Sequence, residues 1–309
     1  DKGYTYVTNK AELNAATGDK LLGLFHTSFM NYKLDRDDVG SNEPNLTEMT
    51  AKTLEFLNRN NNQGFFAMIE GARIDHAAHA LDFAGVWKET VEFDDAVKYA
   101  VDWAKNNGNT LVVALSDHET MGMAASEPMN INKLKEISVS PEYMATQFQI
   151  QEGRYTAESI KNVFRNHAGI ELTDDQVTQF NQRVVDAQGR IIPLFRVGWE
   201  IGSIIANHYN AGGMNSEIRA QSPTGGHTGA MVPIFAYGVG AQTFNGVFDN
   251  TDVPKVIAQL AGVSLETIKV YVEEKRVRFA VQPIITGGRT LVPIREISEA
   301  LGAEVRWNQ

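Results

Sequence analysis

Short apolar runs separated by polar, turn-rich sequence recur along the chain. Residues 65–69 (FFAMI) and 111–115 (LVVAL) are uninterrupted runs of strand length, and residues 21–25 and 232–237 follow the same pattern. A strand without polar alternation is typical of a site where both faces are covered, as in a parallel sheet packed between helices. The runs therefore predict buried strands of an α/β fold.

Helical periodicity fills the segments between these runs. Apolar side chains recur at intervals of three and four, which predicts helices over residues 47–58, 87–105 and 253–260. Asn107-Gly108 is a stop signal directly after the second of these helices. The order strand 65–69, helix, strand 111–115 predicts a βαβ unit with a right-handed crossover.

Residues 124–219 have a different, polar and amphipathic texture. Residues 156–167 and 173–187 have helical spacing, and the second segment opens with TDDQ, which resembles a capping box. We expect a helical insertion over the edge of the sheet. Its sequence fits a cover for an active site and, equally well, plain surface structure.

The composition changes again after residue 262. Short strand-like runs at residues 268–272, 276–280 and 290–293, a turn at Gly287-Gly288 and a helix at 294–301 predict a small α+β module. We therefore expect two domains, residues 1–262 and 263–309.

Composition limits the kinds of partner and of metal site that this chain can have. The chain has 309 residues, a net charge of -10 and no cysteine. An acidic protein is poorly suited to nonspecific nucleic-acid binding, which needs a cationic surface. Without cysteine there is no thiolate site, so histidine and carboxylate must hold any metal ion. No apolar run reaches the length of a membrane span, and the charged opening sequence does not resemble a signal peptide.

The first candidate site is MIEGARIDHAAHA, at the end of the predicted strand 65–69. Asp75 and His79 lie four residues apart, so in a helix they share one face, where a carboxylate and an imidazole can bind one cation. Glu70 lies at the carboxyl end of the strand, the edge where open α/β sheets place ligands. A solvated helix surface often has the same spacing.

Two further segments supply candidate ligands. Asp117 and His118 follow the strand predicted at 111–115, and His227 lies in the glycine-rich segment PTGGHTGA before the run at 232–237. A buried unpaired carboxylate is costly, so Asp117 is expected either in solvent or on a metal ion. A single loop histidine is equally compatible with a plain surface role.

Taken in order, these three segments resemble the bacterial alkaline phosphatases over roughly residues 1–262. The resemblance implies a three-layer αβα fold with a mainly parallel sheet, of which this chain is the C-terminal part. It also implies two zinc ions and one magnesium ion: Asp75, His79 and His227 match ligands of the first zinc, Asp117 and His118 match ligands of the second, and Glu70 matches the magnesium carboxylate.

The resemblance further implies hydrolysis of phosphate monoesters by double displacement, through a phosphoserine that zinc-activated water then releases. It implies a homodimer for the complete protein. The family's nucleophile lies in an Asp-Ser-Ala segment upstream of the metal motifs, and no such segment occurs in this chain. We therefore expect a fragment of a longer protein that lacks the serine and is inactive by itself.

Two alternatives remain open at this stage. A phosphodiesterase or sulfatase of the same superfamily would share the zinc pattern, although such enzymes generally lack the counterpart of Glu70. A non-catalytic, metal-binding or surface-anchored fragment is the alternative outside enzymes.

The C-terminal sequence GGRTLVPIREISEALGAEVRW resembles the copper amine oxidase N-terminal-like module of secreted bacterial enzymes. It contains neither histidine nor cysteine, so we expect no copper there. The resemblance implies attachment to a surface and an extracellular or cell-surface location in a bacterium.

Overall fold

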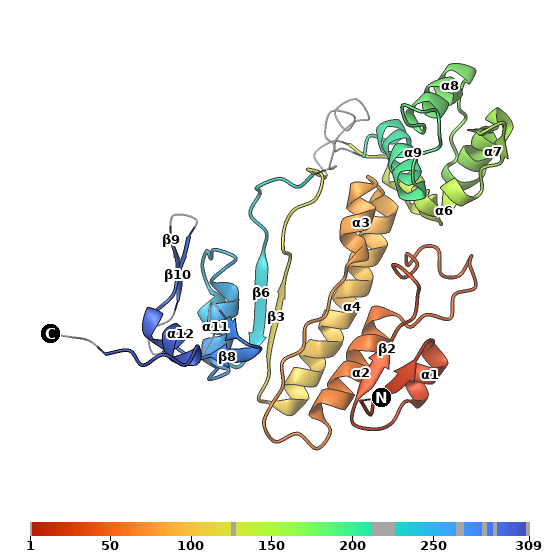
Figure 1. The fold of residues 1–309 in the computed structure, drawn as a ribbon. Helices are drawn as coiled ribbons and strands as arrows, with labels where there is room; N and C mark the ends of the chain where they lie inside the picture. The colour runs from red at the N-terminus through yellow and green to blue at the C-terminus, as the bar shows by residue number, and fades with distance from the viewer. Residues whose placement is uncertain are drawn as a thin grey trace. The chain divides into compact units, whose positions relative to one another are not determined.

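A computed structural model describes residues 2–124, 128–211, 226–263, 269–279, 283–286 and 289–306 (Figure 1). The chain divides into two compact units, residues 1–241 and 242–309. The candidate site residues all belong to the first unit.

The first unit opens with a small parallel pair of strands. Strands β1 (Thr5–Val7) and β2 (Leu21–Gly23) pair in parallel, and helix α1 (Lys10–Ala15) connects them. A minor core of Val7, Leu13 and Ala16 forms beside this pair. Strand β2 confirms the first three residues of the strand predicted at 21–25.

Three helices form the scaffold of the candidate site. Helix α2 (Leu46–Asn58) begins with a capping box, and it packs on the long helix α4 (Phe83–Asn107), as does α3 (Arg73–His79). Gly108 ends α4 with φ 74°, a left-handed conformation in which a side chain would be strained. The helices predicted at 47–58 and 87–105 are confirmed.

The prediction of a strand at residues 65–69 is wrong, and so is the βαβ unit that depends on it. This segment is not part of any strand, and Phe66 and Met68 are 69% and 84% exposed. A strand needs a neighbour to pair its backbone groups and to cover its apolar faces, and no described residue pairs with this run.

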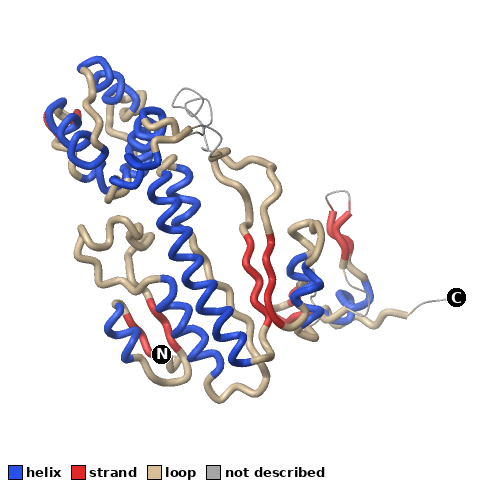
Figure 2. Tube along the Cα trace, turned by 180° about the vertical axis from the view of Figure 1, so that it is seen from behind, coloured by secondary structure: helices blue, strands red, loops and turns tan. Residues whose placement is uncertain are grey.

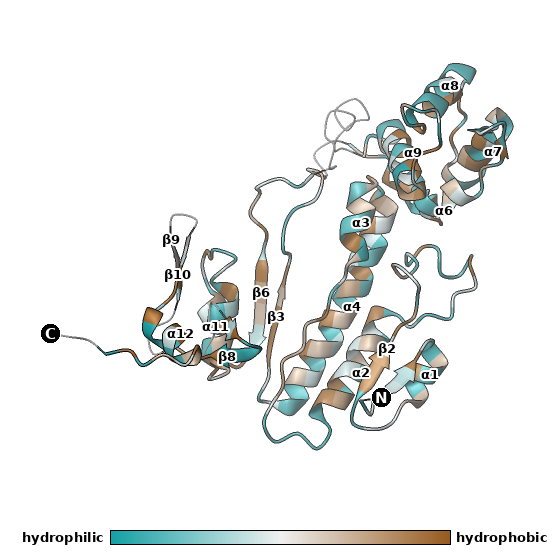
Figure 3. Ribbon diagram, viewed as in Figure 1, coloured by the Kyte–Doolittle hydropathy of each residue, from teal (hydrophilic) through white to brown (hydrophobic). Residues whose placement is uncertain are grey.

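The next predicted strand forms but pairs differently. Strand β3 (Leu111–Leu115) is antiparallel to β6 (Ile234–Gly238), with Leu111 opposite Gly238, and both ribbon views place the two side by side (Figures 1 and 2). Apolar residues dominate the upper part of β6 (Figure 3). The runs at 111–115 and 232–237 are thus confirmed as strands, joined across the helical insertion.

The described part of the insertion is mostly helical, as predicted. It contains a β-hairpin, β4 (Ile150–Gln151) with β5 (Arg154–Tyr155), and helices α5 (Ile131–Glu136), α6 (Pro141–Thr146), α7 (Ala157–Ala168), α8 (Asp174–Arg183) and α9 (Leu194–His208). The capping box expected at TDDQ is present, because Thr173 and Gln176 exchange hydrogen bonds at the start of α8.

This insertion holds the main core of the unit. Phe164, Phe180 and Ile201 are fully buried in it, and burying such a side chain contributes about 1.5–3 kcal/mol. Leu81 joins the same core, which ties the insertion to the turn between α3 and α4. At this contact Gly202 lies so close to the Ala80 carbonyl that an added Cβ would be 1.7 Å from its oxygen.

The second unit contains short elements. They are the 3-10 helix η1 (Ala241–Phe244) at its boundary, helix α11 (Val253–Leu260), the hairpins β7 (Val270–Val272) with β8 (Lys275–Val277) and β9 (Ile284–Thr286) with β10 (Arg289–Leu291), and helix α12 (Ile294–Ala300). Strand β9 was not predicted, and the turn predicted at Gly287-Gly288 lies outside the described residues. No helix in the described ranges is long and apolar enough to cross a membrane.

Candidate metal centre

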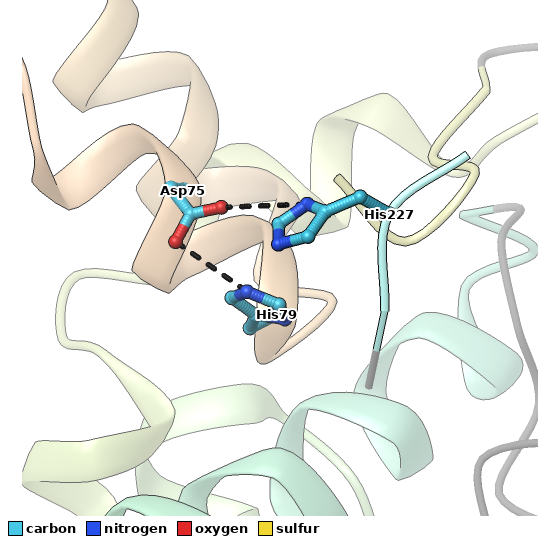
Figure 4. A group of neighbouring side chains, drawn as sticks. All are labelled: Asp75, His79 and His227. Atoms are coloured by element: carbon cyan, nitrogen blue, oxygen red, sulfur yellow. Dashed lines mark ion pairs between the residues drawn. The ribbon is translucent and has the colours of Figure 1, made fainter. Parts of the chain in front are cut away.

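Three candidate ligands from two distant segments meet at helix α3. Asp75 and His79 lie one turn apart on α3, with 3.4 Å between Asp75 Oδ2 and His79 Nε2. His227 reaches them from the segment before β6, and its Nδ1 lies 4.0 Å from Asp75 Oδ1. Figure 4 shows one carboxylate oxygen of Asp75 facing each of the two imidazoles. One donor atom from each residue lies within 4.8 Å of the others.

The packing of α3 sets the direction of its ligands. Ala77 and Ala78 are buried, and α3 packs on α4. Burying the alanines fixes the rotation of the helix about its axis. Asp75 and His79 are therefore held together on a partly accessible face, which is the arrangement that their spacing predicts.

His118 lies directly beside this group. Its ring centroid is 3.7 Å from that of His227, and the Nδ1 atoms of both rings contact the carbonyl oxygen of Glu119, at 3.2 and 2.8 Å. A carbonyl oxygen only accepts, so both Nδ1 atoms donate a proton to it. Metal-binding histidines are commonly oriented in this way, with one ring nitrogen donating to a carbonyl oxygen.

Sequence reasoning missed two residues that position these side chains. The Thr120 hydroxyl donates to Asp75 Oδ1 at 2.7 Å, and the Glu119 carboxylate accepts the backbone N–H and the hydroxyl of Thr228 at 3.0 and 2.6 Å. Burial raises the pKa of Glu119, but the hydrogen bonds from Thr228 outweigh it, so this pKa lies below its usual range. The only sequence signal for these roles was adjacency to the candidate ligands.

The remaining candidates are less closely gathered. Asp117 is 87% exposed, and its Oδ2 lies 3.4 Å from His118 Nε2. Glu70 is exposed and does not belong to the group of close donor atoms. The structure thus joins Asp75, His79 and His227, places His118 and Asp117 at their edge, and leaves Glu70 outside the group.

The chemistry of the donor set fits zinc. Two imidazoles and a carboxylate are common zinc ligands, each about 2 Å from the ion, so ligands of one ion lie about 3–4 Å apart. The donor atoms lie within 4.8 Å of one another, so they must move closer together to bind one ion. Their partial exposure leaves room for a further ligand.

Comparison with known proteins identifies the family of this chain. The family model described as alkaline phosphatase matches residues 1–263, and the model described as copper amine oxidase N-terminal domain matches residues 271–309. Alkaline phosphatase 4 of Bacillus subtilis (strain 168) is 32% identical over 262 residues, which are 84% of this chain and 52% of that protein. Alkaline phosphatase 3 of the same strain is 32% identical over 82% of this chain and 51% of its own length. The chain thus spans about half the length of these relatives.

Solved structures share the fold. The cold-active alkaline phosphatase of the psychrophile Shewanella sp. matches with a TM-score of 0.64 and 25% identity, over 84% of this chain and 59% of that one. The Thermus thermophilus alkaline phosphatase matches with a TM-score of 0.66 and 24% identity, over 85% of this chain and 57% of that one. These matches confirm the predicted alkaline phosphatase-like α/β fold. With a family match that spans residues 1–263, the chain belongs to the alkaline phosphatase family.

Proposed function

We propose that the protein to which this chain belongs hydrolyses phosphate monoesters at a centre of two zinc ions and one magnesium ion. The observation that carries the proposal is the convergence of Asp75, His79 and His227, which come from segments far apart in the sequence. Family membership supports the same activity. Because the chain spans about half of its relatives, the activity is proposed for the complete protein.

Each candidate ligand has a place in this proposal. Asp75, His79 and His227 would hold the first zinc, and His118 with Asp117 the second. Glu70 would serve magnesium. Bound there, the cations would supply Lewis-acid stabilisation of the oxygens of the transferring phosphoryl group.

The residues of this chain prepare the site. The Thr120 hydroxyl orients the Asp75 carboxylate, and the Glu119 carbonyl accepts from Nδ1 of both His118 and His227. The Glu119 carboxylate ties Thr228 to this strand end, which keeps His227 close to α3. A prearranged donor set loses less free energy on ordering when an ion binds.

The test is a comparison of substrates with the complete protein. Rates are measured on 4-nitrophenyl phosphate, bis(4-nitrophenyl) phosphate and 4-nitrophenyl sulfate, before and after removal of metal by a chelator and after return of zinc and magnesium. We expect the monoester to be preferred and its hydrolysis to depend on metal. A preference for the diester or the sulfate, or full activity without metal, would refute the proposal.

We also propose an extracellular or cell-surface location and a homodimer for the complete protein. The match of residues 271–309 to the copper amine oxidase N-terminal domain supports the location, and family membership supports the dimer. Fractionation of the producing cells and sedimentation of the purified protein test these two points. A cytosolic fraction that retains the protein would contradict the first, and a monomer at micromolar concentration the second.

A further inference from the structure

A pocket of about 380 Å³ lies beside the candidate metal centre. Its walls come from α3, α6, α9 and the segment around Phe29, all within the first unit. His79 lines the pocket and also belongs to the group of close donor atoms. A molecule that binds at the centre therefore meets this pocket directly. The volume suits a ring-sized organic group, since small-molecule sites span about 300–1,000 Å³.

Aromatic side chains dominate the apolar part of the lining. The Trp199 ring stacks on the His79 ring, with centroids 5.5 Å apart and an interplanar angle of 22°, and Phe195 meets Trp199 edge-on at 5.4 Å. Phe29 and Phe195 are 60% and 45% exposed. Exposed rings at the rim of a concave site leave apolar area that a planar ligand can cover.

Two charged groups of the lining, Arg73 and Glu142, are engaged with each other or with the backbone. Arg73 donates to the Met30 carbonyl at 2.7 Å, lies 3.9 Å from the Tyr32 ring centre and 3.9 Å from Glu142. Asp82 also lines the pocket, and its buried Oδ2 accepts no hydrogen bond within the described residues. The guanidinium of Arg73 thus faces the two carboxyl groups of Asp82 and Glu142, and this balance disfavours an anionic ligand in the pocket. An uncharged ring, with a hydroxyl as an optional donor, fits better.

We propose that this pocket binds the aryl group of an aromatic phosphomonoester. Its role as a leaving-group site rests on the proposed function, in which water supplies the oxygen that goes to phosphate, the bond from phosphorus to the aryl oxygen breaks, and that oxygen takes a proton to leave as a phenol. The pocket holds the ring while His79 contributes to the centre that binds the phosphoryl group. Binding of the ring itself needs neither metal nor phosphate.

The experiment measures binding of 2-naphthol to the metal-free chain by ligand-observed NMR. The saturated analogue decahydro-2-naphthol is the matched probe without an aromatic ring. Phe195→Ala and Phe29→Ala alter exposed rim residues, Trp199→Ala removes the stacking ring, and Trp87→Ala is the control for an exposed tryptophan outside the pocket. Circular dichroism checks that each variant is folded.

We expect 2-naphthol to bind, and each pocket variant to weaken it by about three- to tenfold, the range expected for the loss of one aromatic contact. Trp87→Ala should bind as the wild type does, and the saturated probe should bind more weakly. No binding of 2-naphthol, equal binding by Phe195→Ala and Phe29→Ala, or equal binding of both probes would overturn the proposal. These outcomes are independent of phosphatase activity, because neither probe contains phosphate and no metal is added.

Discussion

Asp82 is a buried carboxyl at the N-terminus of α4, and its replacement by asparagine should change how stability depends on pH. Its Oδ1 accepts the Gly85 N–H at 2.9 Å, and asparagine can cap a helix as well as aspartate. Burial, and to a smaller extent the nearby carboxyls of Asp35 and Glu89, raise the pKa of Asp82 from 3.8 to about 7. The substitution keeps the cap and removes the charge.

The direction and size of the effect follow from this pKa. A carboxyl whose pKa is raised by folding stabilises the folded state most below its unfolded pKa, and that contribution is lost as the pH rises through the folded value. A difference of about three pKa units corresponds to about 4 kcal/mol, lost between about pH 4 and pH 8. Burial also raises the pKa values of Asp35 and Glu89, so a smaller loss in the same direction persists in the variant.

Urea unfolding of the metal-free chain at pH 4.5 and pH 8 measures the effect. We expect Asp82→Asn to be more stable than the wild type by up to about 4 kcal/mol at pH 8, and by about 1 kcal/mol at pH 4.5. Asp94→Asn removes the same charge from an exposed position of the same helix and should change stability by less than about 0.5 kcal/mol. An equal effect of Asp82→Asn at both pH values, or no gain at pH 8, would refute the reasoning.

Two further predictions concern the site and its support. Thr120→Val removes the hydroxyl that donates to Asp75, and it should weaken zinc binding about 10- to 100-fold in a chelator competition. The control, Thr178→Val, removes a hydroxyl that donates to the Asp174 carbonyl and should leave zinc binding unchanged. Equal zinc affinities of the wild type and Thr120→Val would show that Thr120 does not position the ligand. Gly202→Ala places a methyl group against the Ala80 carbonyl and should lower the free energy of unfolding in urea by about 1–3 kcal/mol. In the control, Gly229→Ala, the added methyl group meets no atom within 4 Å, so this loss should not occur. A wild-type stability of Gly202→Ala would contradict the close packing of α9 on the turn between α3 and α4.

The parts of the fold that depend on local sequence were predictable. Asn107-Gly108 ends α4 because the left-handed residue after a helix favours glycine, and Thr173 with Gln176 caps α8 within a single turn. The spacing of Asp75 and His79 places both on one face of α3 for the same local reason. None of these features needs a distant partner.

Contacts between distant segments were predicted only where the family resemblance indicated them, as for His227 beside Asp75 and His79. Residues 65–69 have the composition of a strand, but no described residue pairs with them, and β3 pairs with β6 from beyond the insertion. The stack of Trp199 on His79 and the bond from Thr120 to Asp75 likewise join segments that no local pattern connects. The metal roles of the six candidate ligands, Glu70, Asp75, His79, Asp117, His118 and His227, stay predictions until metal binding is measured.

A calorimetric titration of the metal-free chain with zinc most directly tests the central claim, that Asp75, His79 and His227 form a metal site. The wild type should bind zinc, and Asp75→Asn, His79→Ala and His227→Ala should each weaken that binding by at least about tenfold. His208→Ala, a histidine outside the site, serves as the control and should bind as the wild type does. The account would be contradicted if the wild type bound no zinc, or if each of the three single variants bound zinc as tightly as the wild type.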